Sequence, residues 1–326
     1  MSPKKKSPAP KAAAKRPAGK GPAWISKLRC PACGHGALQA GPKRQGDYGA
    51  WGVAGVRCPK CRQAYPVLEG GILQMIPKGD LSRYAYWEKM HSAVDADAVI
   101  EAYRRSFGQR QAFVETYYCM PRISRRLGWT YRDSVELGCG WGVYSMSLAR
   151  AGMVKDVWLL DISRSAMRGT AKVFKAFGIQ PFMIQGEIHS LPFKDGAFDL
   201  SLSGGLYEHF VGQEQQDLVT ENCRVSKRVL CQVPEGSLAY WIYRRLVTLK
   251  MGKWPFGFEV PLQRRRLREL YEAGGAKVLA WDYHNLASAV LFSQARKRPW
   301  LQAFSWRPAP LYLLRHDAVL AAETGR

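Results

Sequence analysis

The sequence lacks a long apolar run. Its best stretch, Val278 to Phe292, is interrupted by Asp282, His284 and Asn285, and so falls short of the roughly 20 apolar residues that a membrane-spanning helix needs. The first 22 residues contain no acidic residue and no apolar segment of the kind that forms the centre of a secretory signal. These absences argue against a membrane-spanning or secreted protein, and we expect a cytoplasmic one.

The chain has instead an excess of positive charge, which is confined to its flanks. Its 326 residues are 47% hydrophobic, which is enough for a folded core of enzyme size, and its net charge is +23. Residues 1–22 carry +7 among Pro, Ala and Gly, residues 23–79 carry +6, residues 80–240 only +1 and residues 241–326 +9. We expect a disordered basic tail over residues 1–22. The flanks favour an anionic partner such as RNA or an anionic membrane surface.

Four of the eight cysteines form two CxxC pairs, Cys30 with Cys33 and Cys58 with Cys61. Each short turn presents two thiolates to one metal, and two such turns complete a tetrahedral Zn²⁺ site. Disulfides are the alternative, but the chain has no secretory signal. Four thiolates leave no open coordination position, so the sequence predicts a structural zinc in a small ribbon over residues 23–79, whose last hairpin turns at Gly70 and Gly71.

From residue 134 onward, apolar strands alternate with amphipathic helices. This alternation predicts a Rossmann-like α/β domain with a doubly wound, mainly parallel sheet over residues 129–326, preceded by the ribbon and by a helical lead-in at residues 80–128. Tyr84, Tyr86 and Trp87 near the start of the lead-in are interpreted as helix packing, with a wall of the substrate site as the alternative. The predicted strands are 134–137, 156–160, 181–185, 198–203, 228–233 and 277–282, with a last strand at 287–292 or 311–314. The predicted helices of this domain are 144–151, 163–177, 214–225 and 263–273.

The first predicted strand of this domain ends in a glycine-rich turn that leads directly into a helix. The turn reads Glu136-Leu-Gly138-Cys-Gly140-Trp-Gly142, which lacks the GxGxxG spacing of dinucleotide-binding folds. The second strand ends in Asp161, and a third segment runs from Gln185 to Leu200. Together these motifs resemble the class I S-adenosylmethionine-dependent methyltransferases, and the third segment is similar to their type 11 branch.

The resemblance covers about residues 110–290 and implies a role for each matched position. Glu136 and the glycine turn should hold the methionine portion of S-adenosylmethionine, Asp161 should accept hydrogen bonds from the ribose hydroxyls, and Ile162 should press on the adenine. Glu187 takes the position usually held by Asp near the adenine amine. The alternative for Asp161 is a helix N-cap. The full cofactor set implied by the resemblance is Glu136, Gly138, Cys139, Gly140, Trp141, Gly142, Asp161, Ile162, Gly186, Glu187, Ile188 and Ser203.

His209 follows the fourth predicted strand of the domain, where this fold faces its methyl acceptor. A histidine there has the pKa of a general base, and a packing role is the alternative. The sequence lacks the Asn/Asp-Pro-Pro-aromatic tetrapeptide of methyltransferases that modify base amino groups, and it lacks a Pro-Cys nucleophile after that strand. These absences disfavour both kinds of base methylation.

Residues 234–262 form an insertion in the position of a substrate lid. Its segment 240–251 is amphipathic and basic, and it either lies on a membrane surface or packs its aromatic side on the domain. The ribbon resembles zinc-ribbon modules at the N-terminus of bacterial methyltransferases, including some that modify ribosomal RNA, and the small activator subunits of RNA and protein methyltransferases.

Three functions follow in order of preference. The first is methyl transfer to a small-molecule, lipid or glycan acceptor. The second is methylation of rRNA or tRNA guided by the ribbon and the basic flanks, and the third is non-catalytic binding of nucleic acid.

Overall fold

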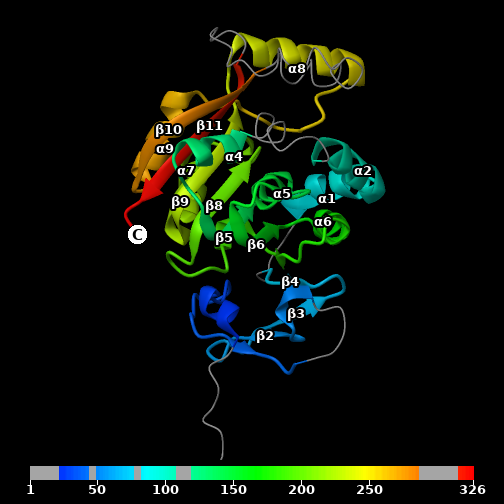
Figure 1. The fold of residues 1–326 in the computed structure, drawn as a ribbon, viewed down its shortest axis with the longest axis vertical. Coiled ribbons are helices and arrows are strands. Elements are labelled where there is room, and N and C mark those ends of the chain that lie inside the picture. The colour runs from blue at the N-terminus through cyan, green and yellow to red at the C-terminus, as the bar shows by residue number, and fades with distance from the viewer. Residues whose placement is uncertain (1–21, 44–48, 77–81, 108–118, 286–314) are drawn as a thin grey trace, which may run out of the picture.

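The computed structural model describes residues 22–43, 49–76, 82–107, 119–285 and 315–326. These residues form an α/β fold around an 11-stranded sheet with the order β1-β2-β3-β4-β7-β6-β5-β8-β9-β11-β10 (Figure 1). The strands are β1 (Gln39–Ala40), β2 (Gly55–Arg57), β3 (Ala64–Leu68), β4 (Ile72–Gln74), β5 (Tyr131–Leu137), β6 (Val154–Asp161), β7 (Phe182–Gln185), β8 (Phe198–Gly204), β9 (Ser226–Pro234), β10 (Ala276–Asn285) and β11 (Arg315–Thr324). The α-helices are α1 (Ala85–Ser92), α2 (Ala96–Phe107), α4 (Cys119–Arg126), α5 (Val143–Arg150), α6 (Arg164–Ala176), α7 (Gly212–Val225), α8 (Leu238–Met251) and α9 (Arg264–Ala273). The 3-10 helices are η1 (Ala23–Lys27), η2 (Gly49–Trp51), η3 (Ser82–Tyr84), η4 (Ile188–Ser190) and η5 (Tyr207–His209).

Strands β7, β6, β5, β8 and β9 are parallel and form the centre of the sheet. Nearly every residue of β5 and β6 is buried, as expected for parallel strands that helices cover on both faces. Helices α5 and α6 pack on one face, and α7 and α9 pack on the other. The predicted α/β fold with a doubly wound, mainly parallel sheet is confirmed, with strand ends that differ from the predicted ones by up to three residues.

The predicted last strand cannot be compared directly with the structure. Both proposed ranges, 287–292 and 311–314, lie outside the described residues, and the strand that completes the described sheet is β11. It runs antiparallel between β9 and β10, and Ala318 to Ala322 along it are fully buried. Its register depends on the two neighbouring strands, which a local apolar pattern does not reveal.

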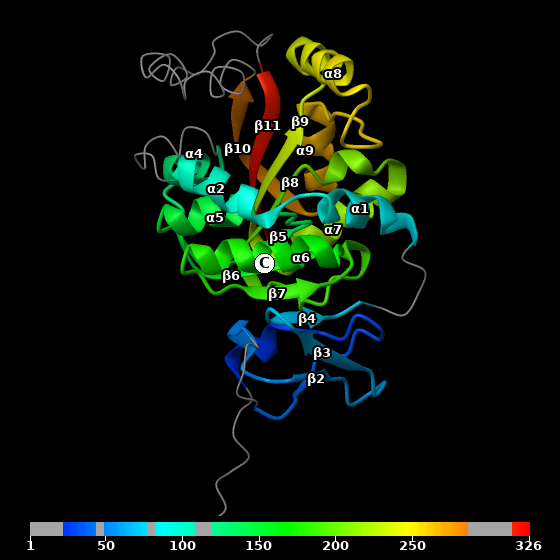
Figure 2. The same ribbon diagram turned by 90° about the vertical axis from the view of Figure 1, so that its right-hand side faces the viewer.

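The ribbon continues the central sheet instead of standing apart from it. Strand β4 pairs in parallel with β7, placing Ile72 opposite Met183 and Leu73 opposite Ile184. The Met75 N–H then donates to the Gln185 carbonyl oxygen at 2.8 Å. Figure 2 shows β4 directly beside β7, with the ribbon at that edge of the sheet. The ribbon therefore covers an edge that would otherwise present unpaired backbone groups.

The ribbon also covers a face of the sheet that lacks a helix. The connection from β7 to β8 spans residues 186–197 and contains only the short η4, whereas such a crossover usually carries an α-helix. Trp51 of the ribbon packs edge-on against Trp158 of β6 and Phe182 of β7, at ring distances of 5.4 and 5.1 Å. Lys27 adds an ion pair to Asp133 at 2.9 Å. The ribbon thus supplies apolar cover that the crossover does not provide.

None of the described helices is long and apolar enough to cross a membrane.

Candidate active site

The glycine turn between β5 and α5 lines a cavity of about 570 Å³. Gly138, Gly140 and Gly142 have φ angles of +62°, +48° and +68°, which side-chain-bearing residues rarely adopt. A Cβ at Gly142 would lie 2.6 Å from the Phe174 ring, so this position requires glycine for space as well. Gly138 and Gly140 line the cavity, whereas Gly142 lies behind its wall, and the backbone of the turn is open to a ligand.

Asp161 ends β6 and lines the same cavity at a relative exposure of 6%. Its two carboxylate oxygens accept hydrogen bonds from the N–H groups of Gly140 and Ser163, both at 2.8 Å. Burial raises the pKa of this carboxyl above its usual value. The N-cap of α6 is Ser163, whose hydroxyl accepts from the Ala166 N–H, so Asp161 is not the helix cap. Its carboxylate fixes the glycine turn against β6 and faces the ligand space.

Glu136 of β5 is the second carboxylate at this end of the cavity and is almost fully buried. Its Oε2 accepts a hydrogen bond from the Ser145 N–H in the first turn of α5, at 2.7 Å. Burial raises the pKa of Glu136 to about 7. An acceptor group therefore lies where the N-terminus of α5 meets the glycine turn.

The remaining residues of the implied cofactor set fall into two groups. Cys139, Trp141, Ile162 and Ile188 line the cavity beside the residues described above. Gly186, Glu187 and Ser203 are not among the described lining residues. Glu187 accepts a hydrogen bond from the Tyr84 hydroxyl at 2.6 Å and lies 3.5 Å from His189 Nδ1, so its carboxylate is engaged behind the wall.

The α1 region supplies part of the wall, which corrects the interpretation of its aromatic cluster as helix packing. Tyr84, Trp87 and His91 line the cavity, and a Cβ on Gly140 would lie 3.4 Å from the His91 ring. Helix α1 is held on α6 by Glu88, which accepts from the side-chain hydroxyl of Ser165 at 2.5 Å. Aromatic residues at the start of a helix were the only sequence signal, and they do not reveal which neighbour the helix meets.

His209 ends η5 at the other end of the cavity. Its Nδ1 lies 2.6 Å from the Phe258 carbonyl oxygen, and because a carbonyl only accepts, Nδ1 carries the proton. The backbone of Gly205 also forms a hydrogen bond with the ring. Burial lowers the pKa of His209 below its usual value, so the ring is neutral at pH 7. The Trp87 ring packs edge-on against it at 4.6 Å.

The predicted lid segment, residues 234–262, contains α8 and the loop that follows it. Tyr240, Tyr243, Trp254 and Phe256 of this segment line the cavity. The Tyr86 hydroxyl donates to the Pro255 carbonyl oxygen at 2.6 Å and thereby ties the lid loop to α1. The outward face of α8 exposes apolar side chains instead of packing all of them on the domain, including Trp241, Leu246 and Leu249.

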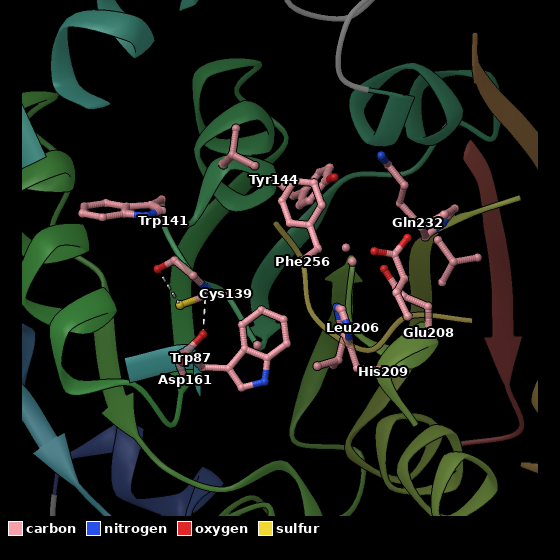
Figure 3. Close-up of a pocket in the computed structure, with 18 of the residues that line it drawn as sticks. Trp87, Cys139, Trp141, Tyr144, Asp161, Leu206, Glu208, His209, Gln232 and Phe256 are labelled. Carbon is pink, nitrogen blue, oxygen red and sulfur yellow. Dashed lines mark hydrogen bonds between the residues drawn. The ribbon is translucent and has the colours of Figure 1, made fainter. Parts of the chain in front are cut away.

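The cavity connects the two ends of the site. Figure 3 shows Asp161, Cys139 and Trp141 on one side, Glu208 and Gln232 on the other, and Trp87 and Phe256 between them. Its volume lies within the 300–1,000 Å³ that small-molecule sites usually have. One cavity can therefore hold two reactants side by side.

The four cysteines predicted as zinc ligands lie together in the ribbon. Their Sγ atoms are all within 4.8 Å of one another, and both Cys30 to Cys61 and Cys33 to Cys58 are 3.6 Å apart. A disulfide needs about 2.05 Å, so these sulfurs are not bonded. Tetrahedral Zn–S bonds of about 2.3 Å place sulfurs roughly 3.8 Å apart, so the cluster fits zinc.

Comparisons with known proteins agree with this geometry. Residues 135–228 match the family model described as "Methyltransferase domain", which bears out a methyltransferase domain in this part of the chain. A search of the curated proteins finds no match.

Several solved structures are similar to this chain. Magnesium protoporphyrin IX methyltransferase from Synechocystis is 14% identical with a TM-score of 0.45, over 75% of this chain and 95% of that chain. A chain from the complex of a Haloferax volcanii methyltransferase activator with a methyltransferase is 14% identical with a TM-score of 0.46, over 72% and 98%. The YcgJ protein from Bacillus subtilis is 14% identical with a TM-score of 0.43, over 68% and 99%. These likenesses assign no acceptor to this chain.

Proposed function

Because the chain carries a methyltransferase domain, we propose that it transfers a methyl group from S-adenosylmethionine to a small-molecule, lipid or glycan acceptor that binds beneath the lid segment. The observation that carries this proposal is the single cavity that reaches from the glycine turn and Asp161 to the lid and His209. Methyl transfer needs the two reactants in line and shielded from water, and a cavity with two ends beneath a lid segment supports that need.

The residues at the turn end fit the cofactor. Asp161 presents carboxylate oxygens to the ribose hydroxyls, and the glycine turn together with Glu136 holds the methionine portion. Ile162 and Ile188 give the adenine two apolar contacts. When bound, S-adenosylmethionine supplies a methyl group that its positive sulfur activates for transfer.

The residues at the lid end act on the acceptor. The lid segment and Trp87 exclude water and position the acceptor against the turn end. Burial lowers the pKa of His209, so in this proposal its neutral ring takes the proton that the acceptor atom loses. Neither the glycine turn nor Asp161 moves a proton in this mechanism.

The small acceptor is favoured over RNA by the position of the ribbon. The ribbon pairs with β7 and covers the sheet, which gives it a structural task that needs no nucleic acid. We propose that Cys30, Cys33, Cys58 and Cys61 hold one structural Zn²⁺ there. The basic tail before residue 22 is outside the described residues. Its only role in this proposal is to contact an anionic surface, and truncation of the tail would test that role.

Asp161 provides the first test. Calorimetry should show S-adenosylhomocysteine binding to the full chain, and Asp161→Asn should weaken it at least tenfold, because losing one charged acceptor costs about 1.5–3 kcal/mol. Asp199→Asn, a surface carboxylate paired with Lys227, is the control and should bind normally. No binding by the wild-type protein would contradict the enzymatic function and favour the non-catalytic alternative.

Labelled S-adenosylmethionine incubated with fractionated lysate should transfer label to a small-molecule or lipid fraction. Label recovered in RNA would instead favour the RNA methyltransferase. The same assay with a chain that starts at Pro22 distinguishes the contribution of the tail to methyl transfer from that of the catalytic domain.

A further inference from the structure

The cavity is lined by acidic side chains although the chain as a whole is strongly positive. Five carboxylates line it, and no lysine or arginine belongs to its lining within the described ranges. Glu136 and Asp161 lie at the turn end, where the cofactor of the proposed function brings its own positive charge. The other three carboxylates, Glu208, Glu259 and Asp317, have no role toward the cofactor in the proposed function.

These three carboxylates come from three separate parts of the chain. Glu208 is on η5, Glu259 is in the lid segment, and Asp317 is on β11. All three are buried, with relative exposures of 2%, 7% and 9%. Only the tertiary fold brings them to one end of one cavity. They therefore differ from a run of acidic residues that are adjacent in the sequence and exposed to water.

Two of the three have protein partners that the structure shows. Glu259 accepts hydrogen bonds from the Tyr240 hydroxyl at 2.9 Å and from Trp254 Nε1 at 3.0 Å. Asp317 accepts from the Gln232 side chain at 3.0 Å. These hydrogen bonds orient the two carboxylates.

Glu208 is different because its Oε2 is buried with no hydrogen-bond partner among the described residues. The charges of Glu259 and Asp317, added to burial, raise the pKa of Glu208 well above its usual value. A buried carboxylate without a partner costs several kcal/mol, and a bound cation relieves that cost. Figure 3 shows Glu208 on the wall opposite Asp161, within the ligand space.

The Arg244 guanidinium does not serve as that cation. Arg244 donates to the Tyr240 hydroxyl at 2.9 Å and to the backbone carbonyl of Glu259 at 3.2 Å. Its guanidinium also lies 5.1 Å from the Trp254 ring centre. It therefore braces the lid from outside the cavity lining and leaves Glu208 uncompensated.

The lid adds aromatic faces to the same end of the cavity. Tyr240, Tyr243, Trp254 and Phe256 all line it. Aromatic faces attract an ammonium group within about 6 Å, most strongly where water is excluded. Carboxylates and aromatic rings together make a site for an organic cation.

We propose that the methyl acceptor is an amine that enters as an organic cation, with its ammonium group held by Glu208 Oε2 and surrounded by the lid aromatics. Because an ammonium nitrogen has no lone pair, it first loses a proton to His209, and the neutral amine then accepts the methyl group. This inference rests on the proposed function and names its substrate class. It excludes phosphate-rich and carboxylate-rich acceptors, nucleic acid included, because their charge would oppose the three carboxylates.

The test uses the full chain saturated with S-adenosylhomocysteine at pH 7 and a panel of phenylalkylamines of increasing chain length and N-substitution. Each amine is paired with the alcohol of the same shape. Calorimetry should show at least one amine binding tenfold or more tighter than its alcohol, the gain of a charge-assisted hydrogen bond. Glu208→Gln should remove that preference, and Glu269→Gln on the exposed surface of α9 should keep it.

Binding of S-adenosylhomocysteine to each variant shows that the fold and the cofactor end are intact. Amines that bind no better than their alcohols, or a preference that survives in Glu208→Gln, would overturn the inference while leaving the proposed function in place. A Glu208→Gln protein that loses affinity for S-adenosylmethionine but not for S-adenosylhomocysteine would also overturn it, because Glu208 would then serve the cofactor's sulfonium. Failure of the wild-type chain to bind either cofactor form would overturn both proposals.

Discussion

At the scale of single residues, each of the two cysteine turns is followed by a residue with a left-handed backbone conformation, but the residue type differs. The position after Cys33 is Gly34, with φ +70°, and the position after Cys61 is Arg62, with φ +63°. A left-handed conformation costs a side-chain-bearing residue about 1–2 kcal/mol, whereas glycine adopts it freely.

Arg62→Gly should therefore stabilise the protein by about 0.5–1 kcal/mol, after allowing for the greater freedom of glycine in the unfolded chain. Gly34→Ala should destabilise it by about 1 kcal/mol, because a Cβ there meets no atom within 4 Å and only the backbone conformation is at issue. Urea unfolding at fixed zinc concentration measures both. Equal effects of the two changes would contradict the backbone explanation.

Glu136 gives the protein a distinct pH dependence. Burial raises its pKa to about 7, so the folded protein holds this proton more tightly than the unfolded chain does. Its contribution to the free energy of unfolding is fully present below the unfolded pKa near 4.5 and is lost as the pH rises through about 7. The loss is about 3 kcal/mol for a shift of this size.

Glu136→Gln should accordingly flatten the decline in stability between pH 5 and pH 8. Urea unfolding at several pH values in this range measures the effect. Glu69→Gln, on the exposed hairpin turn of the ribbon, should leave the wild-type slope unchanged. A Glu136→Gln protein that declines as steeply as wild type would show that another group controls this range.

At the scale of elements, the lid loop is tied to α1 by one hydrogen bond. Tyr86→Phe removes the hydroxyl that donates to the Pro255 carbonyl oxygen and keeps the ring. The loss of about 1 kcal/mol should increase lid opening roughly fivefold. Trypsin cleavage after the exposed Lys253 should accelerate by that factor under native conditions.

Tyr131→Phe is the matched control for the lid. It also removes one hydroxyl hydrogen bond, to Ser124, but within the core and away from the lid loop. It should leave cleavage after Lys253 unchanged. If both variants were cleaved equally faster, global unfolding and not lid opening would explain the result.

At the scale of the whole molecule, the ribbon and the methyltransferase domain share one sheet and one aromatic cluster. Trp51 of the ribbon touches Trp158 and Phe182, and β4 pairs with β7. Removing zinc should therefore unfold more than the ribbon, because the exposed edge and rings belong to the central sheet.

Cys58→Ser, or a chelator added to wild type, should lower the melting temperature of the whole chain in one transition, by roughly 10 °C or more if the ribbon contributes several kcal/mol. Calorimetry shows the number of transitions, and metal analysis shows the loss of zinc. Cys223→Ser is a matched control, because this buried thiol is not one of the four clustered cysteines and should leave the zinc content unchanged. Two transitions with an unchanged upper one would mean that the ribbon folds as an independent module.

The sequence by itself determined the features that depend on near neighbours along the chain. The glycine turn, Asp161 at the end of its strand and the two CxxC pairs each lie within a few residues, so their spacing fixes the local geometry. The alternation of strands and helices likewise predicted the parallel sheet. Strand ends moved by a few residues because hydrogen bonding to neighbouring strands decides where pairing stops.

Only the tertiary structure decided which distant segments meet. It brought Tyr84 and Trp87 into the cavity wall, engaged Glu187 behind that wall, and joined the ribbon to β7. It also gathered Glu208 with carboxylates from the lid and from β11. No local pattern encodes such contacts, because burial and charge at these positions are set by side chains that lie far away in the sequence and become neighbours only when the core packs.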